Sequence, residues 1–268
     1  MSTKGINEGG ANHNAILRRI WRLCKACPLQ KQVYASPMTT GLNTRRRLLL
    51  MLAAAALAPK AQAAVTVDLA LVLAIDCSLS VDEYDYQQQL RGTGQALIDS
   101  ALMQLIERGH NKVIAVTAFL WSSPKEQQVI VPWRILASGG AASQVADDIL
   151  TAARKIPAGA TATGDALAFA QNLLANAPVA NRYVVDISTN GHANMGQPVA
   201  PVRDELVAKG ITVNGLAVID REANLAAYMQ QDVTGGADSF VIEATNYNAY
   251  TQAIRIKLFR EIAGVKTV

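Results

Sequence analysis

The stretch VDLALVLAIDCSLS (residues 67–80) decides the fold, because a continuous apolar run ends abruptly on a carboxylate. Such a run is typical of a central parallel strand that is buried on both faces. After it, Asp76, Ser78 and Ser80 place one carboxylate and two hydroxyls at alternate positions. Ligands of α/β sheets bind beyond the carboxyl ends of the strands, so we expect a functional loop here.

Strand and helix patterns alternate along the rest of the chain. We expect strands at 112–121, 127–136, 182–188, 211–219 and 239–244, and helices at about 82–107, 140–155, 164–175, 198–209, 223–232 and 247–263. The short connection 122–124 predicts an antiparallel hairpin, and Pro132 suits an edge strand. The sequence therefore predicts a doubly wound α/β fold, with a mostly parallel central sheet of about six strands, one antiparallel edge strand and helices on both faces.

The net charge of +4 is concentrated at the start of the chain. Residues 1–63 contain 10 of the 25 Lys and Arg residues but only one of the 21 acidic residues. The remainder is acidic, so it offers no basic face to a nucleic acid. The segment NTRRRLLLMLAAAALAPKAQAA (43–64) has the three parts of a secretory signal peptide, and we expect cleavage after Ala63. Its apolar part is too short to span a bilayer, so we expect a periplasmic or secreted protein without a stable membrane span.

The predicted organisation has three parts: an upstream segment 1–37, a signal peptide 38–63 and one α/β domain 64–268. A wrongly assigned start, with Met38 or Met51 as the true one, is the alternative explanation of the upstream segment. Residues 44–49 resemble a twin-arginine export signal, with the general secretory route as the alternative. Cys24 and Cys27 precede the predicted cleavage site, so the domain keeps one cysteine and no internal disulfide.

Two further loops bring oxygen atoms to the same predicted edge of the sheet. GATATGDAL (159–167) places Thr161 before a helix, and DISTNG (186–191) places Asn190 after a strand. Hard cations such as Mg²⁺ prefer oxygen ligands of these kinds. Each loop also has a purely structural interpretation: residues 80–83 form a capping-box pattern, Thr163 suits a helix N-cap, and residues 190–191 suit a tight turn. Both interpretations remain open at this point.

The three loops, in this order along alternating strands and helices, resemble the von Willebrand factor A (vWA) domain over about residues 66–264. The resemblance implies that Asp76, Ser78, Ser80 and Thr161 form a metal-ion-dependent adhesion site, in which the cation binds an acidic side chain of a partner protein. WSSPKEQQVIVPW (121–133) and DISTNGHANMG (186–196) also resemble the exported bacterial family known as domain of unknown function 1194. We therefore expect a protein–protein interaction domain.

One residue departs from the vWA pattern, which has Asp-Gly where this chain has Asn190-Gly191. The Asn190 side chain offers a carbonyl oxygen but no charge. Asp186 cannot replace the missing charge, because four residues along a strand span about 13 Å. We expect Mg²⁺, or Mn²⁺ or Ca²⁺, at Asp76, Ser78, Ser80, Thr161 and Asn190, bound more weakly than with an aspartate. Asn-Gly sequences also deamidate in flexible loops, which is a second hypothesis for Asn190.

Two alternative functions remain. The first is a metal-free vWA scaffold whose site decayed at Asn190. The second is a periplasmic hydrolase with Cys77 as nucleophile and His192 as base. We favour a non-enzymatic role, because Cys77 falls between two predicted ligands and its side chain is expected in the core. There is no phosphate-binding glycine motif. We expect Trp121 and Trp133 to pack in the core or at the sheet edge, and His110 to lie on the surface.

Overall fold

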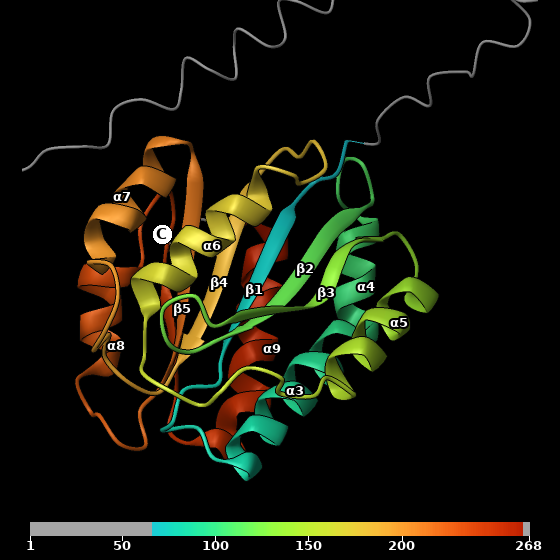
Figure 1. Ribbon diagram of the computed structural model, residues 1–268. Helices are drawn as coiled ribbons and strands as arrows, with labels where there is room; N and C mark the ends of the chain where they lie inside the picture. Colours follow the sequence, from blue (N-terminus) through green and yellow to red (C-terminus); the bar gives the residue numbers. More distant parts are fainter. Residues whose placement is uncertain (1–65, 265–268) are drawn as a thin grey trace, which may run out of the picture. The chain divides into compact units, whose positions relative to one another are not determined.

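The computed structural model describes residues 66–264. The predicted segments 1–37 and 38–63, with Cys24, Cys27 and the cleavage site after Ala63, lie outside the described residues. Residues 66–264 contain a six-stranded sheet with the strand order β3-β2-β1-β4-β5-β6 (Figure 1). The strands are β1 (Ala70–Asp76), β2 (Ile114–Trp121), β3 (Gln127–Leu136), β4 (Tyr183–Thr189), β5 (Ile211–Val218) and β6 (Val241–Ala244).

The pairing of the strands confirms the predicted sheet. β1 lies inside it and pairs in parallel with both β2 and β4. β2 and β3 form the predicted antiparallel hairpin, which makes β3 an edge strand. Pro132 lies where the register of that hairpin shifts, and the Thr117 hydroxyl there donates a 2.7 Å hydrogen bond to the Val131 carbonyl. An edge position tolerates proline because the missing N–H is not needed for a further ladder.

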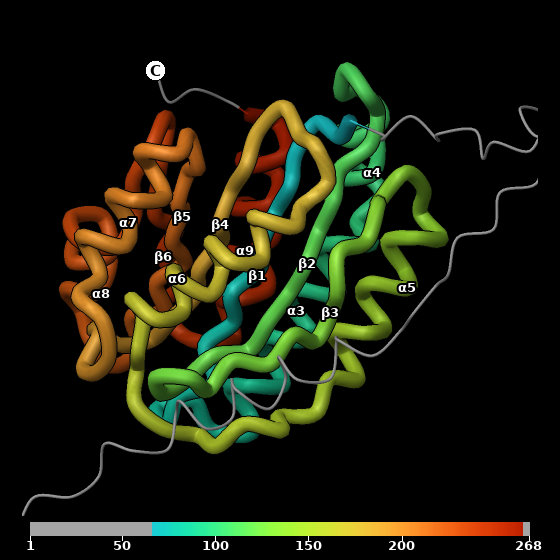
Figure 2. The backbone as a smooth tube through the Cα atoms, turned by 45° about the horizontal axis from the view of Figure 1, so that its top comes forward, coloured from blue at the N-terminus to red at the C-terminus, as the bar shows by residue number. Residues whose placement is uncertain are grey.

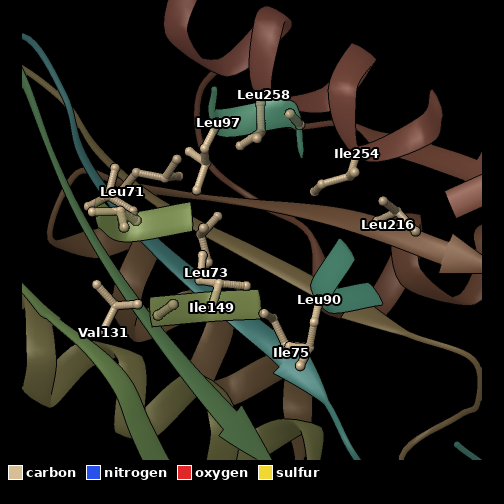
Figure 3. Close-up of a cluster of buried hydrophobic side chains, with 14 of the residues drawn as sticks. Leu71, Leu73, Ile75, Leu90, Leu97, Val131, Ile149, Leu216, Ile254 and Leu258 are labelled. Carbon is tan, nitrogen blue, oxygen red and sulfur yellow. The ribbon is translucent and has the colours of Figure 1, made fainter. Parts of the chain in front are cut away.

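Helices cover both faces of the sheet (Figure 1). One face carries α3 (Glu83–Leu97), α4 (Ser100–Glu107), α5 (Gly139–Leu150) and α9 (Tyr247–Ala263), and the other carries α6 (Thr163–Leu174), α7 (Val199–Ala208), α8 (Leu225–Tyr228) and the π-helix η1 (Met229–Val233). Leu71, Leu73 and Ile75 of β1 enter the first core (Figure 3), and Val72 and Ala74 enter the second. The apolar run of β1 is therefore buried on both faces, as predicted.

The single helix predicted at 82–107 is wrong, because the chain breaks it into α3 and α4 at Ile98 and Asp99. The Asp99 carboxylate accepts a 2.8 Å hydrogen bond from the Ala101 N–H and so caps α4. It also pairs with Arg255 of α9 at 2.6 Å. The helix predicted at 223–232 is likewise divided, into one short turn of α-helix and η1.

Two predicted helix caps are also wrong. Asp82, not Ser80, is the N-cap of α3, and its side chain accepts a hydrogen bond from the Asp85 N–H. Ala162 occupies the N-cap position of α6 without a side-chain hydrogen bond, and Thr163 lies inside the helix. The Ser80 hydroxyl is therefore available for contacts other than a cap.

The carboxyl ends of β1 and β4 meet the connection between α5 and α6 at one edge of the sheet. Figure 2 shows this yellow-green connection running past the ends of the strands toward α6. The Leu79 N–H donates to the Gly159 carbonyl at 2.8 Å, and the Ala162 N–H donates to the Ser122 carbonyl at 3.0 Å. These bonds join the α5–α6 connection to the loops after β1 and β2. None of the helices between residues 66 and 264 has both the length and the apolar character needed to cross a membrane.

Candidate metal site

Asp76 is the last residue of β1, and its carboxylate is fully buried. Oδ1 accepts a 2.7 Å hydrogen bond from the Ser78 N–H, and Oδ2 accepts a 2.6 Å hydrogen bond from the Thr189 hydroxyl. Burial raises the pKa of Asp76, while the hydrogen bonds from Thr189 and Ser78 oppose that rise. Among residues 66–264, no Lys, Arg or His forms an ion pair with it. Asp76 is thus a buried acid without a cationic partner.

Oxygen atoms of Ser78, Ser80 and Asn190 form a closely spaced row. The two serine hydroxyls lie 3.1 Å apart, and the Ser80 hydroxyl donates to Asn190 Oδ1 at 2.6 Å. An octahedral Mg²⁺ site with bonds of 2.0–2.1 Å places adjacent ligand oxygens about 2.9 Å apart. The observed separations of 2.6 and 3.1 Å lie on either side of that edge length and close to it. The donor set, with a carboxylate, hydroxyls and an amide oxygen, therefore fits a hard divalent cation.

Thr161 is pinned beside the loop that follows β4. Its N–H donates to Asn194 Oδ1 at 2.9 Å, and its carbonyl accepts from the Asn194 N–H at 3.1 Å. The side chain is nearly inaccessible, and Oγ1 lies 3.9 Å from the point where a Cβ on Gly191 would stand. The structure thus brings all five predicted site residues to one edge of the sheet.

The structural interpretation of Asn190-Gly191 as a tight turn is wrong. Gly191 does not have the positive φ that such a turn would need, unlike Gly196, Gly210, Gly236 and Gly264. The Asn190 side chain is buried, and both polar atoms of its amide are hydrogen-bonded. Oδ1 accepts from the Ser80 hydroxyl at 2.6 Å, and Nδ2 donates to the Ser80 carbonyl at 3.1 Å. This restraint argues against a flexible loop, which the deamidation hypothesis requires.

Two residues that the sequence did not reveal position Asp76. Thr189 ends β4, one step beyond the Ile75–Ser188 pair, which places its hydroxyl against the Asp76 carboxylate. Gln89 of α3 is buried and donates from Nε2 to the Asp76 carbonyl at 2.9 Å. Aligning the carboxyl end of the predicted strand before Asp76 with that of the predicted strand 182–188 would have placed Thr189 next to Asp76. No pattern in the sequence distinguishes Gln89 from the other glutamines of α3.

Cys77 lacks the features of a nucleophile. It is fully buried in the core, as predicted, and burial raises the pKa of its thiol to about 12. A thiol must ionise to attack, so this environment disfavours the reaction. His192, the predicted base, instead contacts the Glu222 carboxylate through Nδ1 and packs on the Tyr228 ring at 4.2 Å between centroids.

Three minor predictions are confirmed. Trp121 is fully buried, and Trp133 packs at the edge of the second core, where Nε1 donates to the Leu173 carbonyl at 3.1 Å. His110 is exposed.

The part of the chain that the structure describes contains no group of three or more His, Cys, Asp or Glu side chains placed to hold a metal. Metal binding would therefore depend on the mixed oxygen set described above.

The sheet order, the two helical layers and the loops at the carboxyl edge define a vWA-type α/β domain, and solved structures share this fold. The von Willebrand factor type A structure from Catenulispora acidiphila has a TM-score of 0.51 at 16% identity, covering 74% of this chain and 43% of that one. Proximal thread matrix protein 1 from the mussel byssus, in a structure with a zinc-occupied MIDAS motif, has a TM-score of 0.52 at 15% identity, covering 74% and 48%. BatB from Bacteroides thetaiotaomicron has a TM-score of 0.50 at 19% identity, covering 74% and 100%.

The chain belongs to the family described as Protein of unknown function (DUF1194), whose model matches residues 66–266. Both predicted resemblances, to this family and to the vWA fold, are confirmed. The chain spans about half the length of the mussel protein. A search of curated proteins gave no match.

Proposed function

We propose that this chain is an exported interaction domain that binds an acidic side chain of a partner protein through a divalent cation. The cation, Mg²⁺ or alternatively Mn²⁺ or Ca²⁺, would be held by Asp76, Ser78, Ser80, Thr161 and Asn190. One observation carries the proposal: Ser80 Oγ lies 2.6 Å from Asn190 Oδ1 of a separate loop and 3.1 Å from Ser78 Oγ of its own loop, close to the spacing of an octahedral site.

A comparison of two buried acids supports the same conclusion. Asp186 of β4 is buried, and its Oδ1 lies 2.7 Å from Lys257 Nζ. Asp76, on the adjacent strand, is equally buried but has no such partner in the described part of the chain. Burying an unpaired charge is costly, so buried acids usually have a cation or a proton. A divalent cation would fill that role at Asp76.

Each residue of the site has a distinct part. Asp76 contributes the charge, Thr189 fixes its carboxylate, and Ser80 and Asn190 contribute neutral oxygens from facing loops. A bound cation supplies a positive charge at the edge of the sheet that a partner's carboxylate can approach. Because the five proposed ligands include only one acid, the partner's carboxylate would contribute a large share of the negative charge in direct contact with the ion.

Export is part of the proposal and rests on the signal-peptide pattern of residues 38–63. It places the domain in the periplasm or outside the cell. A single buried cysteine suits an oxidising compartment, because it leaves no exposed thiol in residues 66–264.

Metal titration of the 268-residue chain tests the proposal. We expect the wild type to bind Mg²⁺ and Mn²⁺ in calorimetry, and the Asp76→Asn variant to lose binding. Asp204→Asn, which removes an exposed carboxylate of α7, is the matched control and should bind as the wild type does. Circular dichroism establishes that each variant is folded. Metal binding that survives in a folded Asp76→Asn variant would refute the assignment of the site.

Partner binding is tested by a native pull-down from periplasm, with and without EDTA. Loss of the same partner with EDTA, and with Asp76→Asn, would support a bridging metal.

A metal-free scaffold is the second candidate, and one observation favours it. Ser80 and Asn190 are joined by two direct hydrogen bonds, of 2.6 and 3.1 Å, which satisfy both side chains without an ion. This candidate predicts that the wild type takes up no metal and that EDTA leaves partner binding unchanged.

A further inference from the structure

We propose that Glu222 supplies the second negative charge of the metal site, in place of the aspartate that the vWA pattern has at Asn190. The inference rests on the proposed function, because it concerns the same cation. It assigns to this site a residue from a fourth loop, which no spacing in the sequence indicates.

The fold brings Glu222 to the site from the strand next to β4. It lies in the loop after β5, and β5 pairs in parallel with β4, so both strands end at the same edge. Glu222 Oε1 lies 3.5 Å from the point where a Cβ on Gly191 would stand, and Thr161 Oγ1 lies 3.9 Å from that point. The carboxylate oxygen and the predicted ligand hydroxyl are therefore no more than about 7.4 Å apart.

His192 holds the carboxylate in this position. The His192 N–H donates to Glu222 Oε2 at 3.3 Å, and the Nδ1 atom of the ring contacts the same oxygen. The ring packs on Tyr228, whose hydroxyl accepts from the Ala193 N–H at 3.3 Å. Because His192 engages Oε2, Oε1 is the oxygen that faces Gly191. The arrangement fixes one carboxylate oxygen and leaves the other toward the site.

Glu222 could act on the cation without contacting it directly. Mg²⁺ and Mn²⁺ sites usually keep several water ligands, and a carboxylate several ångströms from the ion binds those waters. Glu222 would therefore attract the cation by its charge and accept a hydrogen bond from a metal-bound water. A site with Asp76 alone carries one negative charge, whereas Asp76 and Glu222 together balance a divalent cation when His192 is neutral and donates from Nδ1–H.

The alternative is that Glu222 only anchors the loop through His192. Glu222→Gln separates the two roles, because glutamine keeps an oxygen that can accept from the His192 N–H but has no charge. Asp204→Asn is the control: it removes an exposed carboxylate of α7 and leaves the loop after β5 unchanged.

The test is calorimetric titration of the 268-residue chain with Mn²⁺. We expect Glu222→Gln to bind about 10-fold more weakly than the wild type, because it removes a negative charge near the ion, and Asp204→Asn to bind as the wild type does. Adding Asn190→Asp to Glu222→Gln should restore the wild-type affinity. Equal affinities of Glu222→Gln and the control, or no restoration by Asn190→Asp, would overturn the inference.

The same titration distinguishes this failure from failure of the proposed function. If Asp76→Asn abolishes binding while Glu222→Gln has no effect, Glu222 is only a loop anchor and the metal site stands. If the wild type binds no Mn²⁺, or Asp76→Asn binds as the wild type does, the metal site itself is refuted. Thermal unfolding of each variant shows that a loss of binding does not reflect a loss of fold.

Discussion

A buried cluster of charges between α9 and β4 is expected to make the protein less stable as the pH rises. Lys257 Nζ lies 2.7 Å from both Asp186 Oδ1 and Glu261 Oε1, and all three side chains are almost inaccessible. Two carboxylates against one ammonium leave a surplus negative charge. Burial, followed by the charge of Asp186, raises the pKa of Glu261 from 4.5 to about 7.

The direction of the effect follows from this shift. Glu261 holds its proton more tightly in the folded chain than in the unfolded chain. Its contribution to stability is therefore fully present below about pH 4.5 and is lost as the pH rises through 7. A difference of about 2.5 pH units between the two pKa values corresponds to ~3 kcal/mol of unfolding free energy.

Glu261→Gln tests this reasoning. The variant removes the ionisation but keeps an oxygen for Lys257 Nζ and for Asn214 Nδ2, which donates to Glu261 Oε1 at 3.0 Å. We expect urea unfolding at pH 5 and pH 8 to show a fall of roughly 2 to 3 kcal/mol for the wild type and a markedly smaller fall for the variant. Glu205→Gln, at an exposed position of α7, is the control. A pH dependence of Glu261→Gln equal to that of the wild type would refute the reasoning.

Four further outcomes are expected. Asn190→Asp should bind Mn²⁺ about 10-fold more tightly than the wild type in calorimetry, because it adds a charge next to the ion; unchanged affinity would contradict this. Cys77 should resist iodoacetamide in the folded chain and react after unfolding, as read from its peptide by mass spectrometry, since burial raises the pKa of its thiol to about 12. The Asn190 peptide should show little +1 Da product after prolonged incubation, because both ends of its amide are hydrogen-bonded; rapid deamidation would show that the loop opens. Thr189→Val should lower the free energy of unfolding by ~2 kcal/mol in urea, since it removes a hydrogen bond to a buried carboxylate; an unchanged value would mean that the bond contributes nothing.

The fold was predictable because its signals are local. The apolar run of β1 indicates burial on both faces, and the short connection after Trp121 requires a hairpin. The break between α3 and α4 was not predictable, because apolar residues continue across it. The Asp99 carboxylate caps α4 and also pairs with Arg255, which lies 156 residues further along the chain. The ion pair between Asp99 and Arg255 can be seen only in the folded structure.

The candidate site shows even more clearly that local sequence patterns do not reveal contacts between distant residues. The pattern of residues 80–83 fits a capping box, and nothing nearby in the sequence decides between that and a ligand role for Ser80. The structure excludes the capping box, because Asp82 caps α3 and the Ser80 hydroxyl donates to Asn190, which is 110 residues away. Local rules therefore named loop residues that meet at one edge of the sheet but could not assign their hydrogen bonds.

The charge of such a site depends on topology rather than on spacing. β1, β4 and β5 are neighbouring parallel strands, so the loops after all three converge on one edge. A carboxylate missing from one loop can then be supplied from any other, with no fixed distance along the chain. Asn190 and Glu222 are separated by 32 residues, yet a carboxylate oxygen of Glu222 lies 3.5 Å from the Cβ position of the residue after Asn190. On our proposal, the second charge of the metal site comes from Glu222 in the loop after β5 and not from an aspartate at position 190. The vWA ligand motif, which does not include that loop, therefore gives too low a count of the negative charges at the site.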